Sequence, residues 1–177
     1  MSGRAALLVA AAFLSEGTLT AWLLPEAWAD RAWVVPAPLL VVLVYVAIYV
    51  HRYEAMAWGF AAGLLQDVVY YGHAVGVRAF GLAAVAYAAG ALARWVSRPT
   101  MVVTLAAVFI GCTAFSLFEF GVYRFWLRTS DVPAGWWVVR HGVPSALFNA
   151  VFALAVYLPF RRFLERSRTA REEEGRG

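Results

Sequence analysis

The sequence predicts an all-α, polytopic membrane protein with six transmembrane helices, and its composition and hydropathy support this fold class. Of the 177 residues, 63% are hydrophobic and only 15% are charged, whereas about 25% of the residues in a soluble domain are charged. The mean hydropathy is +0.68 and 16% of the residues are aromatic. One core cannot bury so many apolar residues, so lipid must surround much of the surface. A soluble globule, a disordered chain and a coiled coil are therefore excluded.

Six stretches are apolar enough to cross a bilayer as helices. A helix rises 1.5 Å per residue, so about 20 residues span a hydrocarbon core of about 30 Å. In chain order the stretches are Ala5–Leu24, Val34–Val50, Ala55–Tyr71, Val77–Trp95, Thr100–Phe120 and Val139–Phe160. No linker divides the chain, so we expect one transmembrane domain over residues 1–160 and a basic, then acidic, cytoplasmic tail over residues 161–177.

The first stretch contains Glu16, the residue with the highest free-energy cost of burial in a membrane interior. Its N-terminal end also resembles a signal peptide with an A-x-A site at 27–29, but the apolar run is too long, so we expect a retained helix. A charge at mid-bilayer costs at least about 2.5–3.5 kcal/mol, which makes Glu16 a functional candidate. We favour an acid that is hydrogen-bonded inside the bundle over a proton or ion site, because no second acid is expected at similar depth.

The third stretch is the weakest candidate for a spanning helix, because it is short and contains four residues, two glycines and two polar residues, that share one face. Gly59, Gly63 and Asp67 recur at four-residue spacing with Gln66 beside them, so all four occupy about 100° of the helix. A re-entrant helix is an alternative, and we expect a spanning one. The glycines allow another helix to approach closely. We favour packing within the chain over docking of a partner, and Asp67 could pair with Arg78 across the following turn.

The fifth and sixth stretches each carry a polar stripe at helical spacing. Both stripes are expected to bind each other, at about 0.6 kcal/mol per hydrogen bond, and a binding cavity between them is the second interpretation. The stripes are Cys112, Ser116 and Glu119, and His141, Ser145 and Asn149. The long join between these stretches, Gly121–Trp137, is too aromatic for a free loop, so it should lie at the membrane interface or be covered by a partner.

The distribution of arginine predicts that both termini are cytoplasmic. The chain has 15 Arg and no Lys, and cytoplasmic loops are enriched in basic residues. Ten arginines fall on the side of the N-terminus, including those of the tail, and five on the other. The near-membrane half of the tail should bind anionic headgroups. We read this charge as a topology signal and expect no nucleic-acid partner.

Candidate catalytic and metal-binding residues are scarce. The three histidines fall in different segments without metal-ligand spacing, and the sequence contains no nucleophile or phosphate-loop motif. We therefore expect no metal site, no cofactor and no enzymatic activity.

The order of these features resembles the MreD family of rod shape-determining membrane proteins. The residues that carry the resemblance are Pro38-Leu39-Leu40, Gly59-Phe60-x-x-Gly63-Leu64-Leu65-Gln66-Asp67, Gly76, Tyr87, Ala146-Leu147-Phe148-Asn149 and Tyr157-Leu158-Pro159 with Arg161-Arg162. Only the Gly-Leu-Leu-Gln-Asp element with Gly76 is specific. The sequence departs from the family at two positions. Members of the family often have an acid or an amide where this chain has Leu39, and commonly an amide where it has Glu16.

The resemblance implies a non-enzymatic scaffold in the plasma membrane of a bacterium. Such proteins partner the bitopic protein MreC, and through it connect the actin-like MreB to the peptidoglycan polymerase RodA and its transpeptidase. We expect the partner-binding or structural polar residues to be Glu16, Gly59, Gly63, Gln66, Asp67, Gly76, Arg78 and Asn149. Whether the chain also forms a homo-oligomer stays open.

An alternative function is a small-molecule-capturing subunit of an energy-coupling-factor transporter, whose architecture is similar to this arrangement of six helices. In that case Glu16, Asp67, Arg78, Glu119 and Asn149 would line a ligand site that opens outward.

Overall fold

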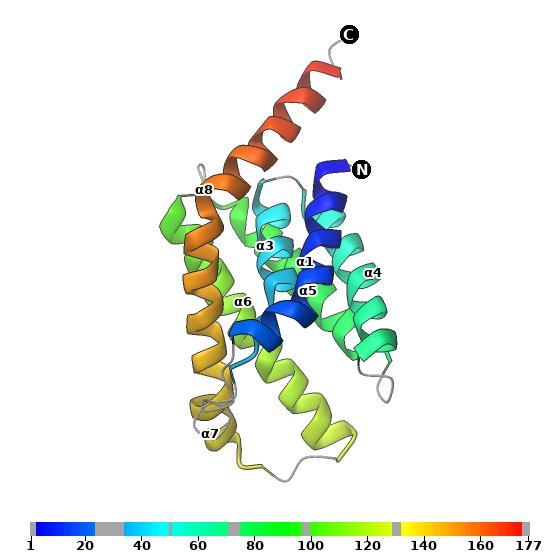
Figure 1. The fold of residues 1–177 in the computed structure, drawn as a ribbon, viewed down its shortest axis with the longest axis vertical. Helices are drawn as coiled ribbons and strands as arrows, with labels where there is room; N and C mark the ends of the chain where they lie inside the picture. Colours follow the sequence, from blue (N-terminus) through cyan, green and yellow to red (C-terminus); the bar gives the residue numbers. More distant parts are fainter. Residues whose placement is uncertain are drawn as a thin grey trace.

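The protein is a bundle of antiparallel helices. The computed structural model describes residues 3–23, 34–49, 51–70, 75–96, 100–128 and 132–174, and every regular element in these ranges is helical. The elements are α1 (Gly3–Leu23), α3 (Pro38–Tyr49), α4 (Arg52–Tyr70), α5 (Val77–Ala93), α6 (Met101–Gly121), η1 (Val122–Trp126), α7 (Ala134–Trp137), η2 (Val138–Gly142) and α8 (Val143–Glu174). Successive long helices alternate in direction, and both chain ends lie at the same end of the bundle (Figure 1). The all-α prediction is confirmed.

Each of the six predicted stretches coincides with a long helix, namely α1, α3, α4, α5, α6 or α8. The largest differences are at the second stretch, whose helix begins four residues later than expected, and at the last, whose helix continues well beyond Phe160. The A-x-A sequence at 27–29 and the turn residues 72–74 lie outside the described residues.

Helix α3 forms the centre of the bundle. It contacts α1, α4, α5, α6 and α8, and every residue in it except Ile48 is buried. The Tyr45 hydroxyl donates a hydrogen bond to the Ala153 carbonyl at 2.8 Å, and the Tyr49 hydroxyl lies 3.2 Å from Thr104 Oγ1. Buried hydroxyls are costly unless they are paired, so these bonds fix α3 against α6 and α8.

The outward faces of the other long helices are apolar. Large exposed side chains occur on all of them, for example Leu14, Phe60, Phe80, Ile110 and Val151. Soluble proteins rarely expose apolar surface of this extent. The helical runs Met101–Trp126 and Ala134–Phe160 are also long and apolar enough to cross a membrane. These features indicate a membrane protein.

The segment expected to be a long join, Gly121–Trp137, is mostly helical. The π-helix η1 continues α6, with the Leu127 N–H donating to the Val122 carbonyl at 2.9 Å. The short α7 and the π-helix η2 then lead directly into α8. Phe125 and Trp126 nevertheless remain exposed, so an interfacial or partner-covered position for this segment stays a prediction.

Helix α8 does not end at the predicted boundary between domain and tail. It runs without a break to Glu174 and contains Pro159 in its interior. Proline removes one backbone hydrogen bond of a helix and bends it, and the last turns diverge from the bundle beyond this point (Figure 1). The first part of the expected tail is therefore a continuation of α8.

Candidate functional site

A buried ionic cluster joins four helices around Arg78, in the first turn of α5. Its Nε lies 3.1 Å from Glu119 Oε1 on α6, and its Nη1 lies 3.8 Å from Glu16 Oε1 on α1. Nη1 also donates a hydrogen bond to Gln66 Oε1 on α4 at 3.3 Å, and Gln66 Nε2 donates to Glu16 Oε2. We call these four residues, Glu16, Gln66, Arg78 and Glu119, the ionic cluster.

The cluster corrects one expectation about Glu16. The sequence predicts no second acid at the depth of Glu16, yet Glu119 binds the same guanidinium. The sequence does not reveal this contact, because Glu119 lies at the edge of its own apolar stretch, Thr100–Phe120. The partners of Glu16 nonetheless lie inside the bundle, as the hydrogen-bonded interpretation requires.

Asp67 caps the N-terminus of α5 instead of pairing with the Arg78 side chain. Its carboxylate accepts hydrogen bonds from the backbone N–H groups of Gly76 at 2.8 Å, Arg78 at 3.2 Å and Ala79 at 3.2 Å. The first N–H groups of a helix have no partner within the helix, and a negative charge there is favourable. Gly76 has a φ of 102°, which glycine adopts without strain. Asp67 and Arg78 therefore meet across the turn, through the backbone N–H of Arg78 and not through its guanidinium.

The glycine face of α4 is filled by α5. A Cβ atom at Gly63 would lie 2.6 Å from Ala79 Cα, and one at Gly59 would lie 3.0 Å from the Leu82 carbonyl oxygen. Both distances are shorter than normal contacts, so the two backbones touch where the glycines lie. Packing within the chain, which the sequence reading favoured, is correct. The alternative, in which this face receives a partner's helix, is wrong because no space remains.

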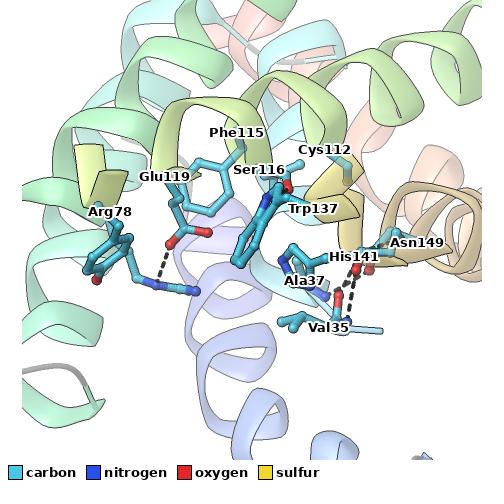
Figure 2. A pocket seen from close by; sticks show the side chains of 13 residues that line it. Val35, Ala37, Arg78, Cys112, Phe115, Ser116, Glu119, Trp137, His141 and Asn149 are labelled. Carbon is cyan, nitrogen blue, oxygen red and sulfur yellow. Dashed lines mark hydrogen bonds and ion pairs between the residues drawn. The ribbon is translucent and has the colours of Figure 1, made fainter. Parts of the chain in front are cut away.

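A cavity of about 310 Å³ adjoins the ionic cluster (Figure 2). Arg78 and Glu119 form one end of it, and Asn149 lies at the other. Residues of both predicted polar stripes line its wall. The stripes therefore border a cavity, which was the second of the two interpretations of their spacing. The lining residues are Val35, Ala37, Leu40, Arg78, Cys112, Phe115, Ser116, Glu119, Tyr123, Trp137, His141, Ser145 and Asn149.

An extended segment, residues 34–37, precedes α3 and takes its hydrogen bonds from α8. The Val35 N–H donates to Ser145 Oγ at 3.0 Å, and the Ala37 N–H donates to Asn149 Oδ1 at 2.8 Å. Asn149 Nδ2 donates to the Val35 carbonyl at 3.1 Å. Ser145 and Asn149 therefore bind this backbone, and not the α6 stripe as expected. The sequence signal that we missed is Pro36, which cannot donate a backbone hydrogen bond and interrupts a helix.

Trp137 closes one side of the cavity. Its indole N–H donates to Ser116 Oγ at 3.2 Å, and its ring centroid lies 4.3 Å from that of His141. The centroid of the Trp137 ring also lies 5.5 Å from that of the Phe120 ring. The sequence predicts Trp137 at the end of the long join Gly121–Trp137, whereas the helical structure of that segment turns its side chain into the bundle.

Comparisons with known proteins agree on one family. The family model of the rod shape-determining protein MreD matches residues 4–167. The rod shape-determining protein MreD of Bacillus subtilis strain 168 is 30% identical over 128 residues, which cover 72% of this chain and 73% of the relative. No solved structure matches the chain.

Proposed function

The chain belongs to the MreD family of rod shape-determining membrane proteins, and from this membership we propose that it is a non-enzymatic, multi-pass scaffold of the bacterial cell-elongation machinery. It would hold an MreC-type bitopic protein in the plasma membrane and so connect MreB to RodA and its transpeptidase. The geometry of the ionic cluster supports a scaffold, because its charges bind one another and brace four helices.

The binding surface for the bitopic partner is an apolar groove between α1 and α4. This groove has a volume of about 360 Å³ and is lined only by apolar and aromatic residues. Its small members, Ala6, Ala10, Ala61 and Ala62, would let a single transmembrane helix approach closely, as helices do in membranes. Such a surface suits the one membrane helix of a bitopic protein. The glycine face is already occupied, which makes this groove the better candidate.

The first experiment is a pull-down of the tagged protein from its native membrane in a mild detergent. Recovery of a stoichiometric bitopic protein with MreC character supports the scaffold. Recovery of ATPase subunits in its place would contradict it and favour the transporter alternative, in which the polar residues bind a solute.

The groove is tested by filling it. Ala61→Leu adds a large side chain at an exposed position in the groove, and should remove the bitopic partner from the pull-down. Ala114→Leu, at an exposed position on α6 away from the groove, is the matched control and should retain it. Equal recovery with both variants would exclude the groove as the binding surface without affecting the scaffold role.

A further inference from the structure

The cavity beside the ionic cluster has the size and the wall of a ligand site. Its volume of about 310 Å³ lies at the lower end of the range of about 300–1,000 Å³ that is typical of small-molecule sites. Such sites combine apolar and aromatic walls with a few polar groups that orient the ligand. Here the aromatic side chains in the wall include Phe115, Tyr123 and Trp137, and Phe115 and Trp137 lie between the two polar ends (Figure 2).

One polar group in the wall is only partly used by the protein. Glu119 Oε1 binds Arg78 at 3.1 Å, whereas Oε2 has no hydrogen-bond partner among the residues that the structure describes. The carboxylate lies at the cavity wall, between Arg78 and Trp137 (Figure 2). A carboxylate oxygen accepts hydrogen bonds and cannot donate them. A group that binds Oε2 directly must therefore be a donor.

The charges around Glu119 favour a positively charged donor. The ionic cluster contains two carboxylates, those of Glu16 and Glu119, and a single guanidinium. The Asp67 carboxylate is already bound by backbone N–H groups of α5. An ammonium group bound at Oε2 would add a second cation beside these two carboxylates, and it would also be attracted to the face of Trp137; the Arg78 guanidinium already lies over the Phe115 ring, 5.6 Å from its centroid.

We propose that this cavity binds a ligand whose ammonium group donates to Glu119 Oε2 and whose apolar part lies against Phe115 and Trp137. The chemistry has two sources, a free aromatic amine or the ethanolamine headgroup of a membrane lipid. This inference concerns a different surface from the groove between α1 and α4. It can hold or fail independently of the scaffold role.

The chain carries its own reporter for the test. Cys112 is the only cysteine in the sequence, and it lines the cavity. The rate at which N-ethylmaleimide alkylates Cys112 in the purified protein measures access to the cavity. A ligand at about ten times its dissociation constant leaves about one eleventh of the sites free, so alkylation should slow about tenfold.

The probes are tryptamine and phenethylamine, each compared with an acid of similar shape, indole-3-acetate or phenylacetate. We expect the amines to slow alkylation and the acids to leave its rate unchanged. For the lipid source, protein in vesicles that contain phosphatidylethanolamine is compared with protein in phosphatidylcholine vesicles. Slower alkylation with either the amines or phosphatidylethanolamine supports the proposal and identifies the source. Equal rates in every pair, or equal protection by amines and acids, would overturn it.

The role of Glu119 is tested with two matched variants. Glu119→Gln keeps the shape of the side chain and removes its charge, so the protection should disappear. Glu54→Gln removes a carboxylate in the first turn of α4, outside the cavity lining, and should leave protection as in the unmodified chain. Protection that persists in Glu119→Gln would contradict the proposal. The comparison of amines with acids needs no variant, so it decides the question even if Glu119→Gln does not fold.

Discussion

The backbone N–H of Arg78 donates a hydrogen bond to Asp67 at 3.2 Å, while the guanidinium of the same residue binds Glu119. Two acids thus bind one arginine residue through different groups. Asp67 fixes where α5 begins, and Glu119 fixes the direction of the Arg78 side chain in its first turn. The Gly-Leu-Leu-Gln-Asp element consequently has a structural explanation, because its glycine, amide and acid each contact α5 or the ionic cluster.

Removing the cap on α5 should destabilise the fold. Asp67→Ala leaves the N–H groups of Gly76, Arg78 and Ala79 without their acceptor, and losing an N-cap side chain costs about 0.5–2 kcal/mol. We expect a loss near the upper end of this range, measured as the free energy of unfolding in detergent micelles. Val68→Ala, at the neighbouring exposed position, is the control and should change stability by less than about 0.5 kcal/mol. An equal loss in both variants would argue against the cap.

The contact between α4 and α5 should not tolerate a single added methyl group. In Gly63→Ala the new Cβ would meet the backbone of Ala79 at 2.6 Å, and overpacking of this kind costs about 1–3 kcal/mol. The same substitution at Gly121, where a Cβ meets nothing within 4 Å, should be neutral or slightly stabilising. Thermal unfolding of the two variants in parallel checks this difference. A Gly63→Ala protein as stable as Gly121→Ala would refute the close approach.

Replacing Asn149 should lower the free energy of unfolding by more than the loss of one hydrogen bond. Asn149→Ala leaves the Ala37 N–H and the Val35 carbonyl without partners, and each unpaired buried group costs about 1–3 kcal/mol. Thr113→Ala, which removes a hydroxyl bonded within its own helix to the Phe109 carbonyl, should cost clearly less. Chemical denaturation in micelles measures both losses, and a smaller loss for Asn149→Ala would contradict the assigned role.

The charges of the ionic cluster should be strongly coupled. Arg78→Met leaves Glu16 and Glu119 without their common cation, and breaking a buried ion pair costs about 3–5 kcal/mol. Adding Glu119→Gln to Arg78→Met should recover part of this loss, because one unpaired charge is then removed. A double-mutant cycle of unfolding free energies measures the coupling, which we expect to be about 0.5–3 kcal/mol. Additive effects would show that the two side chains act independently.

Hydropathy alone predicted where the helices lie, because helices in lipid must be apolar over most of their length. The glycine spacing in α4 likewise predicted a close helix contact. Neither observation could identify the partner helix, since spacing along one helix contains no information about which neighbour fills it. The choice of α5 depends on Ala79 and Leu82, which present a backbone that the glycines can reach.

The ionic cluster and the cavity were only partly predictable. The sequence predicts Glu16, Gln66, Arg78 and Asn149 as partner-binding or structural polar residues, but it does not predict how they pair. Asp67, the nearest acid across the turn, binds only the backbone N–H of Arg78, whereas the guanidinium binds Glu119, 41 positions away in the sequence. Contacts of this kind depend on the order in which the helices surround α3, and a local sequence pattern does not predict that order.

The extended segment before α3 also constrains the order in which the fold can be completed. Its backbone partners, Ser145 and Asn149, lie 110 and 112 positions further along the chain, so the ribosome makes them long after α3 has left the exit tunnel. Until α8 is in place, the N–H groups of Val35 and Ala37 lack the acceptors that they have in the finished bundle. Helix α8 thus completes the hydrogen bonds of the segment that leads into α3, and a chain truncated before α8 cannot form them.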